Sequence, residues 1–330
     1  MLMKHKESMK GRLQRLLLMQ YKKNEIEATK LVALIEKNYS LLQGLVRQEI
    51  EQALTHAKLN DRITQAEAYR LNKDWQQVLK DHPELKEFSD KQLMTHLSTV
   101  DQALSYALHT HLTANTMKNQ GLIKEALEEA YLKTFLHVTY QIQQGTGVYQ
   151  QIHNPYHVSK LVTEAWVGHE NFIQRLSKNK DKTLKELGMI LKQGYINQKT
   201  PQQMVKDCMN RLNVNQTSAN RLVYTEMANM FGQATADSYE ANSVEEYEIL
   251  ATLDKRTSKL CQSLDGQRFK VSEKNVGVNY PPFHPMCRTT TIPVISRFST
   301  GKRWSKDADG VRREVEDMTY EEWSNKYLTR

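Results

Sequence analysis

The segments DKRTSKLCQSLDG (residues 254–266) and PPFHPMCRTTT (residues 281–291) carry the most distinctive pattern in this chain of 330 residues. The first segment ends in Asp265-Gly266, a dipeptide typical of tight hairpin turns. The second segment is a proline-rich turn, and Arg268-Phe269-Lys270-Val271 between the two has the composition of a short strand. A cysteine in one loop and a histidine with a cysteine in the other predict that the two loops are held together.

Cys261, His284 and Cys287 are the residues that would join the two loops. Thiolate and imidazole groups bind zinc, and a closed structural zinc site needs four ligands. Asp254 is the first candidate for the fourth ligand and Cys208 is the second. The alternative interpretation is that the cysteines are small buried apolar side chains and that His284 is only a turn residue.

Other features of the same segments count against zinc and against catalysis. Ser258 stands where a cysteine would complete a Cys-x-x-Cys pair with Cys261. A zinc deaminase needs His-x-Glu and a later Pro-Cys-x-x-Cys, but Met286 precedes Cys287 and no second cysteine follows. A Cys–His nucleophile needs an orienting partner and an oxyanion hole. We therefore expect no catalytic residues, and a metal-dependent enzyme acting on nucleic acid is the alternative.

The rest of the chain is predicted to be mostly α-helical. Up to about residue 140 glycine and proline are rare, and apolar residues recur at helical spacing. The predicted helices cover residues 13–50, 63–79, 89–114, 122–143 and 166–194, then one beginning with Thr200-Pro201 and another capped by Thr217 or Ser218. Pro83 is expected in the first turn of the segment after the second helix.

A small β module is predicted near the C-terminus. Tyr247, Ile249 and Ala251 alternate with other residues as in a half-buried strand. The β-branched run 289–295 is a further strand, and Pro293 predicts that this strand lies at a sheet edge. The fold class is therefore mostly α, with a long helical N-terminal half followed by an α+β module that carries a small β-hairpin clasp. The predicted regions are 1–145, 155–298, and a polar tail 299–330 whose short helix begins at Thr319-x-x-Glu322.

The charge balance permits contact with nucleic acid. Lysine and arginine number 46 against 38 acidic residues, which gives a formal net charge of +8. The N-terminal segment concentrates basic residues, and an ordinary solvated helix face is the alternative to DNA contact for Lys4, Lys6, Lys10, Arg12, Arg15, Lys22 and Lys23. No apolar run approaches the roughly 18 residues of a bilayer span, and no signal peptide is recognised. The chain has three cysteines, too few for a disulfide scaffold.

Arg221, Thr225 and Glu226 fall within about one and a half turns of a helix. This spacing predicts a hydrogen-bonded cluster in which a buried Arg–Glu arrangement braces the fold. A catalytic glutamate is the alternative interpretation.

Taken in order, these motifs resemble the phage head morphogenesis family, whose members are minor capsid proteins similar to the F protein of phage Mu. The resemblance covers roughly residues 160–295 and rests on an ordered series of short motifs. Besides the Cys261, His284 and Cys287 pattern, it is carried by Arg221, Thr225, Glu226, Asp254, Arg256, Gly266, Pro282 and Arg288.

The resemblance implies a minor head protein that acts in procapsid assembly and has no settled enzymatic activity. Its expected partners are the portal and the capsid or scaffold proteins, with double-stranded DNA as a further partner and no membrane. The expected location is the virion head, reached from the host cytoplasm during assembly. A plain DNA-binding module is the remaining alternative, and it predicts strongly salt-dependent affinity.

Overall fold

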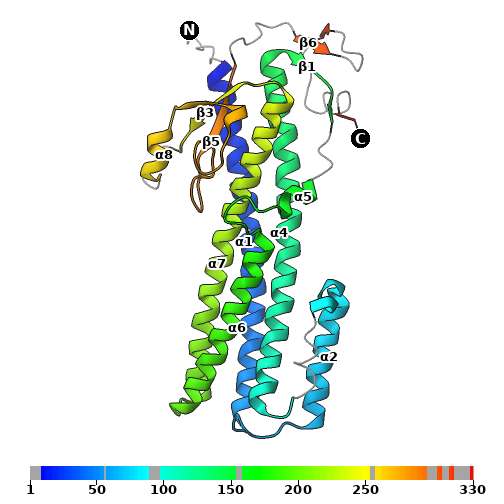
Figure 1. Cartoon of the computed structure of the whole chain (residues 1–330), viewed down its shortest axis with the longest axis vertical. Coiled ribbons are helices and arrows are strands. Elements are labelled where there is room, and N and C mark those ends of the chain that lie inside the picture. The colour runs from blue at the N-terminus through cyan, green and yellow to red at the C-terminus, as the bar shows by residue number, and fades with distance from the viewer. Residues whose placement is uncertain are drawn as a thin grey trace, which may run out of the picture. The chain divides into compact units, whose positions relative to one another are not determined.

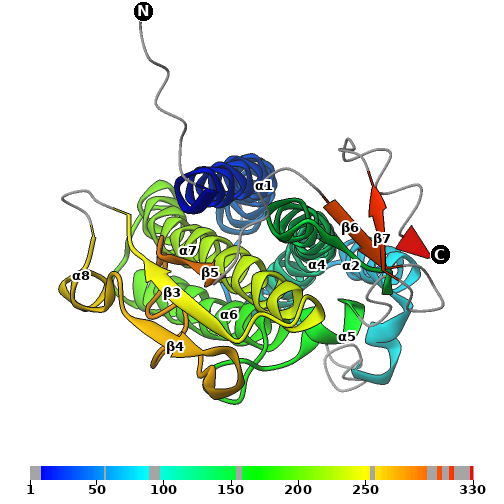
Figure 2. The same ribbon diagram turned by 90° about the horizontal axis from the view of Figure 1, so that it is seen from above.

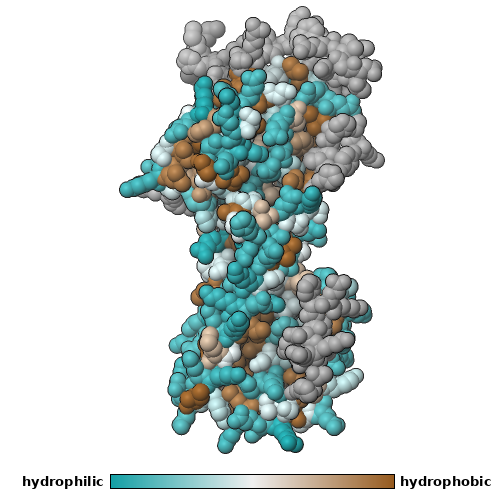
Figure 3. Space-filling view, viewed as in Figure 1, coloured by the Kyte–Doolittle hydropathy of each residue, from teal (hydrophilic) through white to brown (hydrophobic). Residues whose placement is uncertain are grey.

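The computed structural model describes residues 9–55, 57–88, 97–153, 158–252, 257–295, 303–306, 312–315 and 328–329. This part of the chain is mostly helical and carries a small antiparallel sheet near the C-terminus (Figure 1), which confirms the predicted fold class. None of its helices combines the length and the apolar character needed to cross a bilayer. On the face shown in Figure 3, hydrophobic side chains are interspersed with hydrophilic ones.

Long helices form most of the described structure. They are α1 (Met9–Thr55), α4 (Val100–Thr146), α6 (Phe172–Ile196) and α7 (Pro201–Ala241). The shorter helical elements are α2 (Gln65–Asp81), η1 (Pro83–Phe88), α5 (Val158–Thr163), α8 (Lys259–Leu264) and η2 (Val271–Glu273). Pro83 begins η1, as its predicted first-turn position requires.

Two helices continue through positions where the sequence predicted a boundary. The helices predicted at 89–114 and 122–143 are one helix from residue 100 onward, because α4 continues through Gly121. Thr217 and Ser218 do not cap a new helix but lie inside α7, where their hydroxyls donate to the carbonyls of Asn213 and Val214 at 2.9 and 3.0 Å. A single glycine costs a helix only about 1 kcal/mol relative to alanine, so packing along the helix can override it.

The starts of α6 and α7 follow capping chemistry. Thr200 Oγ1 accepts a hydrogen bond from the backbone N–H of Gln203 at 3.3 Å, and the Gln203 side chain accepts from the Thr200 N–H at 2.9 Å. This reciprocal pair confirms the predicted start at Thr200-Pro201. Asn171 and Gln174 form the same arrangement at the start of α6, which extends two residues beyond the predicted end at Gly194.

The C-terminal sheet has the strand order β4-β3-β5. The central strand β3 (Glu246–Leu250) pairs antiparallel with β4 (Arg268–Lys270) and with β5 (Thr290–Val294). The edge position predicted from Pro293 is confirmed. The predicted hairpin turn is wrong, because α8 lies between β3 and β4. Gly266, with φ of +75°, instead makes the turn from α8 into β4, a left-handed conformation that glycine adopts without strain.

Short strands from the C-terminal tail pair with a segment that follows α4. Strand β6 (Arg303–Lys306) lies between β1 (Val148–Tyr149) and β7 (Arg312–Val315), and β8 (Leu328–Thr329) pairs with β2 (Ile152–His153). The sequence predicted none of these strands. The helix predicted to begin at Thr319 lies outside the described residues.

Contacts divide the chain into two compact units that do not follow sequence order. Unit 1 contains Met1–Lys30, Lys124–Trp166 and Arg221–Arg330, and unit 2 contains Leu31–Ile123 and Val167–Asn220. Helices α1, α4 and α7 each contribute residues to both units. The division predicted from the sequence is different, into the consecutive regions 1–145, 155–298 and 299–330. That division stays a prediction.

The core of unit 1 joins the sheet to the helices beside it (Figure 2). Tyr247 and Ile249 of β3 and Ile292 of β5 pack with residues of α7, α4 and α1. The helix residues in this core are Ala236 and Tyr239 of α7, Val138 and Ile142 of α4, and Leu13 and Leu17 of α1. This packing holds the sheet, and with it the two loops of interest, against α7.

Unit 2 contains a buried ion-pair cluster centred on Glu49. Both carboxylate oxygens of Glu49 accept hydrogen bonds from the Arg70 guanidinium, at 2.8 and 2.9 Å, and Oε1 lies 3.3 Å from His111 Nε2. Burial alone would raise the pKa of Glu49, but the hydrogen bonds from His111 and Arg70 outweigh it and lower the pKa to about 2.

We expect Glu49→Gln to remove a pH-dependent part of the stability of unit 2. In the unfolded chain a glutamate titrates near 4.3, so the depressed pKa stabilises the folded state above that pH. The contribution is lost as pH falls from about 4.5 towards 2, and we expect about 1–2 kcal/mol after allowance for the partly exposed Arg70. Urea unfolding between pH 7 and 3 measures it. A variant that loses stability with acid as steeply as the parent would contradict this assignment.

Candidate metal centre

Cys261 is positioned by the first turn of α8. Ser258 caps this helix, since its Oγ accepts a hydrogen bond from the Cys261 backbone N–H at 3.2 Å. Cys261 itself is only 2% exposed and packs with Ala251, Cys287 and the partly buried Phe283. The sulfur atom therefore faces the interior of unit 1.

The loop that carries His284 and Cys287 begins at the cis Pro281–Pro282 bond and turns back on itself. Met286 has φ of +57°, and the Cys287 N–H donates to the His284 carbonyl at 3.1 Å. Two helices hold this turn. Thr225 Oγ1 of α7 accepts from the Met286 N–H at 3.2 Å, and Tyr21 of α1 donates its hydroxyl to the Cys287 carbonyl at 3.0 Å.

The three predicted ligands meet at one point. Cys261 Sγ lies 3.8 Å from Cys287 Sγ and 3.2 Å from His284 Nε2. One donor atom from each of the three residues lies within 4.8 Å of the other two. Both cysteines are buried and His284 is half-buried. The structure thus brings together the Cys–His–Cys set that the sequence singled out.

The two thiols of this cluster differ electrostatically. Burial raises the pKa of Cys261, but hydrogen bonds with Ser258, Thr289 and His284 outweigh burial and leave the pKa below its ordinary value. The pKa of Cys287 is raised, chiefly by burial. Because both sulfur atoms are buried, a substrate could not reach either one as a nucleophile without the loop opening.

Of the two candidates for a fourth ligand, only Cys208 belongs to the described residues. Asp254 falls outside the described residues, as does Arg256. Cys208 is in unit 2, fully buried, and burial raises its pKa to about 12. Among the described residues, no further Cys, His, Asp or Glu joins the Cys261–His284–Cys287 cluster.

Unit 1 contains α7 from Arg221 onward. The motif of Arg221, Thr225 and Glu226 at this point is arranged differently from the prediction. Arg221 is exposed, so it is not one half of a buried ion pair. Thr225 donates to the Arg221 carbonyl at 2.7 Å, and Glu226, which is 2% exposed, accepts a hydrogen bond from Trp166 Nε1 at 2.8 Å. The carboxylate of Glu226 thus ties the chain after α5 to α7.

We expect Trp166→Phe to lower the free energy of unfolding by about 1.5–3 kcal/mol, because it removes a hydrogen bond to a buried carboxylate. Glu226→Leu removes the acceptor oxygens, and the double variant completes a thermodynamic cycle. We expect a coupling energy of about 1 kcal/mol or more from urea unfolding. Additive effects of the two substitutions would show that the contact contributes little.

The remaining motif residues support the two loops. Pro282 is buried in its turn, and Gly266 makes the turn into β4. The carbonyl of Arg288 accepts a hydrogen bond from Thr252 Oγ1 at 2.9 Å, which links the end of the second loop to the end of β3.

The proposed DNA contacts are only partly described. Lys22 and Lys23 are exposed on α1. Lys4 and Lys6 lie outside the described residues, and the side chains of Lys10, Arg12 and Arg15 do too. DNA contact through this segment stays a prediction.

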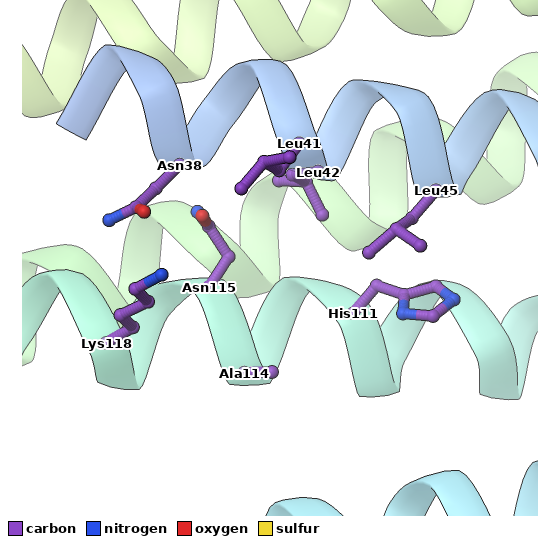
Figure 4. Close-up of a pocket in the computed structure, with 8 residues that line it drawn as sticks. All are labelled: Asn38, Leu41, Leu42, Leu45, His111, Ala114, Asn115 and Lys118. Carbon is purple, nitrogen blue, oxygen red and sulfur yellow. The ribbon is translucent and has the colours of Figure 1, made fainter. Parts of the chain in front are cut away.

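Unit 2 has a cavity of about 200 Å³ between α1 and α4. Asn38 and Leu45 of α1 face Lys118 and His111 of α4, respectively, across it (Figure 4). Its lining is mainly apolar and contains no cluster of metal-ligating groups, so the Cys–His–Cys cluster is the stronger candidate site within the described structure.

Sequence reasoning missed the residues that support the cluster. Ser258 was counted against a metal, yet its Oγ lies 3.0 Å from His284 Nε2 and caps α8. The Ser-x-x-Cys spacing at a helix start was a usable signal for this cap. Tyr21 gave no signal, because it lies 266 residues from Cys287 along the chain.

Residues 185–292 match the model of the family described as Phage Mu protein F like protein. The matched region begins within α6, includes α7, and ends in β5, so it contains the whole Cys261–His284–Cys287 cluster together with Thr225 and Glu226. Comparisons with curated proteins and with solved structures give no significant match. This match confirms, over residues 185–292, the resemblance to that family predicted from the sequence motifs.

Proposed function

We propose that this chain is a minor head protein of a tailed bacteriophage, which joins the procapsid during assembly in the host cytoplasm and contacts the portal. The observation that carries the proposal is the family match over residues 185–292, which supports a role in phage head morphogenesis. The expected location is accordingly the virion, with the other head proteins as partners.

A surface of α1 supports contact with another protein. Leu34, Leu41 and Leu45 recur seven and four residues apart, on one side of the helix, and their exposed fractions are 50%, 57% and 44%. Apolar side chains aligned on a helix are a typical surface for helix-mediated recognition. We assign this surface, called here the Leu34–Leu45 surface, to contact with the portal.

Co-expression with the portal, scaffold and major capsid proteins of the same phage tests the proposal. Procapsids are separated by gradient sedimentation, and the chain is detected by immunoblotting. We expect it in the procapsid fraction when the portal is present and a strong loss when the portal gene is omitted. Absence from procapsids that contain the portal would contradict the proposal.

Two variants locate the contact. Leu41→Lys with Leu45→Lys places charges on the Leu34–Leu45 surface and is expected to reduce incorporation at least tenfold. Met189→Lys is the matched control, because Met189 is an exposed apolar residue of α6. Circular dichroism confirms that both variants remain helical. Equal incorporation of both variants would remove this surface from the proposal.

DNA contact is a second part of the proposal, supported by the net charge of +8 and the exposed Lys22 and Lys23. Each phosphate contact contributes about 0.9 to the slope of log affinity against log salt. Lys22→Ala with Lys23→Ala should therefore lower that slope by about 1–2, measured by anisotropy with a labelled duplex. Lys30→Ala is the control, since Lys30 on the same helix already pairs with Glu27. Affinity independent of salt would contradict DNA contact.

A further inference from the structure

We infer that Cys261, His284 and Cys287 bind one zinc ion, which pins α8 to the loop from Pro281 to Arg288. This inference goes beyond the proposed function and does not depend on it. It rests on the positions of three donor atoms, on the state of the imidazole ring, and on the surroundings of the cluster.

The distances between the donor atoms suit a tetrahedral ion. Zinc lies about 2.3 Å from a thiolate and about 2.0–2.1 Å from an imidazole nitrogen, so tetrahedral angles place two sulfurs about 3.8 Å apart and sulfur and nitrogen about 3.6 Å apart. The two sulfurs are 3.8 Å apart, and Cys261 Sγ is 3.2 Å from His284 Nε2. Cys261 Sγ and His284 Nε2 would thus move apart by about 0.4 Å, and the third pair of donor atoms lies within 4.8 Å.

A hydrogen bond at Nδ1 of the His284 imidazole determines which ring nitrogen can bind a metal ion. Nδ1 lies 2.9 Å from the Pro285 carbonyl oxygen, which can only accept, so Nδ1 carries the proton. Nε2 therefore carries the lone pair, and both Cys261 Sγ, at 3.2 Å, and Ser258 Oγ, at 3.0 Å, lie within hydrogen-bond distance of it. Metal-binding histidines are commonly oriented in this way by a carbonyl on the second nitrogen.

The surroundings favour an ion that joins two loops. Ala251 and Phe283 enclose the sulfur side of the cluster, while Ser258 and Thr289 supply hydrogen bonds to Cys261. Binding would release protons from the two thiols and fix α8 against a loop that has no strand pairing of its own. A disulfide is the competing state, but its bond length of about 2.05 Å is far below the observed sulfur separation.

The test uses the full chain, purified without a polyhistidine tag, stripped with a chelator and kept reduced. Thiol titration of the unfolded chain first confirms that all three cysteines are free. Cobalt(II) alone is then added as the probe. We expect about one equivalent to give the visible absorption of a tetrahedral thiolate complex, and zinc to displace it. Absence of this spectrum in the fully reduced chain would overturn the inference.

Variants assign the ligands. Cys261→Ser, Cys287→Ser and His284→Gln are each expected to weaken cobalt and zinc binding by about 100-fold or more. His284→Gln is the most informative, because His284 is half-buried and its loss should disturb the fold least. Cys208→Ala is the matched control and should bind as the parent does, since Cys208 belongs to unit 2. Full binding by His284→Gln, or loss of binding in Cys208→Ala while the chain stays folded, would contradict the assigned ligands.

Discussion

Tyr280→Ala is expected to lower the free energy of unfolding of unit 1 by about 3–5 kcal/mol, the range for removing a large buried aromatic ring. Tyr280 is 1% exposed, and its ring meets that of Tyr247 edge-on, with 5.0 Å between ring centroids. Its hydroxyl donates to the Gly232 carbonyl of α7 at 2.8 Å. The substitution removes both contacts directly before the loop that carries His284. Urea unfolding followed by circular dichroism measures the loss.

Tyr280→Phe separates the ring from the hydroxyl. It keeps the edge-on contact with Tyr247 but leaves the Gly232 carbonyl without this donor, so we expect a loss of about 1–2 kcal/mol. Equal losses for Tyr280→Ala and Tyr280→Phe would mean that the hydroxyl, and not the ring, holds the sheet against α7.

Gly232→Ala is the second substitution with a large expected effect, a loss of about 1–3 kcal/mol. A Cβ at position 232 would lie 2.9 Å from the Pro281 carbonyl oxygen and 3.4 Å from Cε1 of Tyr280. The nearest atom belongs to the backbone, so the loop from Pro281 must move away from α7 to admit a methyl group. The loss is measured by urea unfolding, and the same sample can be titrated with zinc, whose affinity should fall.

Gly121→Ala is the matched control for that substitution. Gly121 also lies inside a long helix, but a Cβ there would meet nothing within 4 Å. Alanine should therefore stabilise the chain by about 0.5–1 kcal/mol, through helix propensity and a less flexible unfolded state. If both alanine variants changed the free energy of unfolding in the same direction, the close approach of Pro281 and Tyr280 would not explain why position 232 requires glycine.

The sheet and the cluster were predictable because their signals are local. Alternation around Tyr247 and Ile249, the β-branched run 289–295 and the position of Pro293 indicated β3, β5 and the sheet edge, and the structure has all of these. The Cys–His–Cys pattern indicated two loops held together, and the three donor atoms lie side by side. A short strand is encoded within a few residues, so a single sequence suffices to predict it, whereas Asp265-Gly266 did not reveal that α8 lies between β3 and β4.

The errors arose where distant packing decides the outcome. The sequence predicted a break between residues 114 and 122 and a cap at Thr217 or Ser218, but α4 and α7 continue through these positions because their other faces are packed. The pairing of β1 with β6 joins residues about 150 positions apart, and no local sequence pattern predicts such a pairing. The hydrogen bond from Trp166 to Glu226 is of the same kind, because it spans 60 residues.

The division of the chain into two units has a consequence for its synthesis on the ribosome. All of unit 2 lies between Leu31 and Asn220, so its residues have all been translated while about a third of the chain is still missing. Unit 1 needs Tyr21 near one end and Cys287 near the other, and it cannot close before both have left the exit tunnel. Domains generally fold as units during translation, N-terminal segments first. Here unit 2, in the middle of the chain, should fold first. The first thirty residues should adopt their packed positions only after the roughly one hundred residues that follow Asn220 have been synthesised.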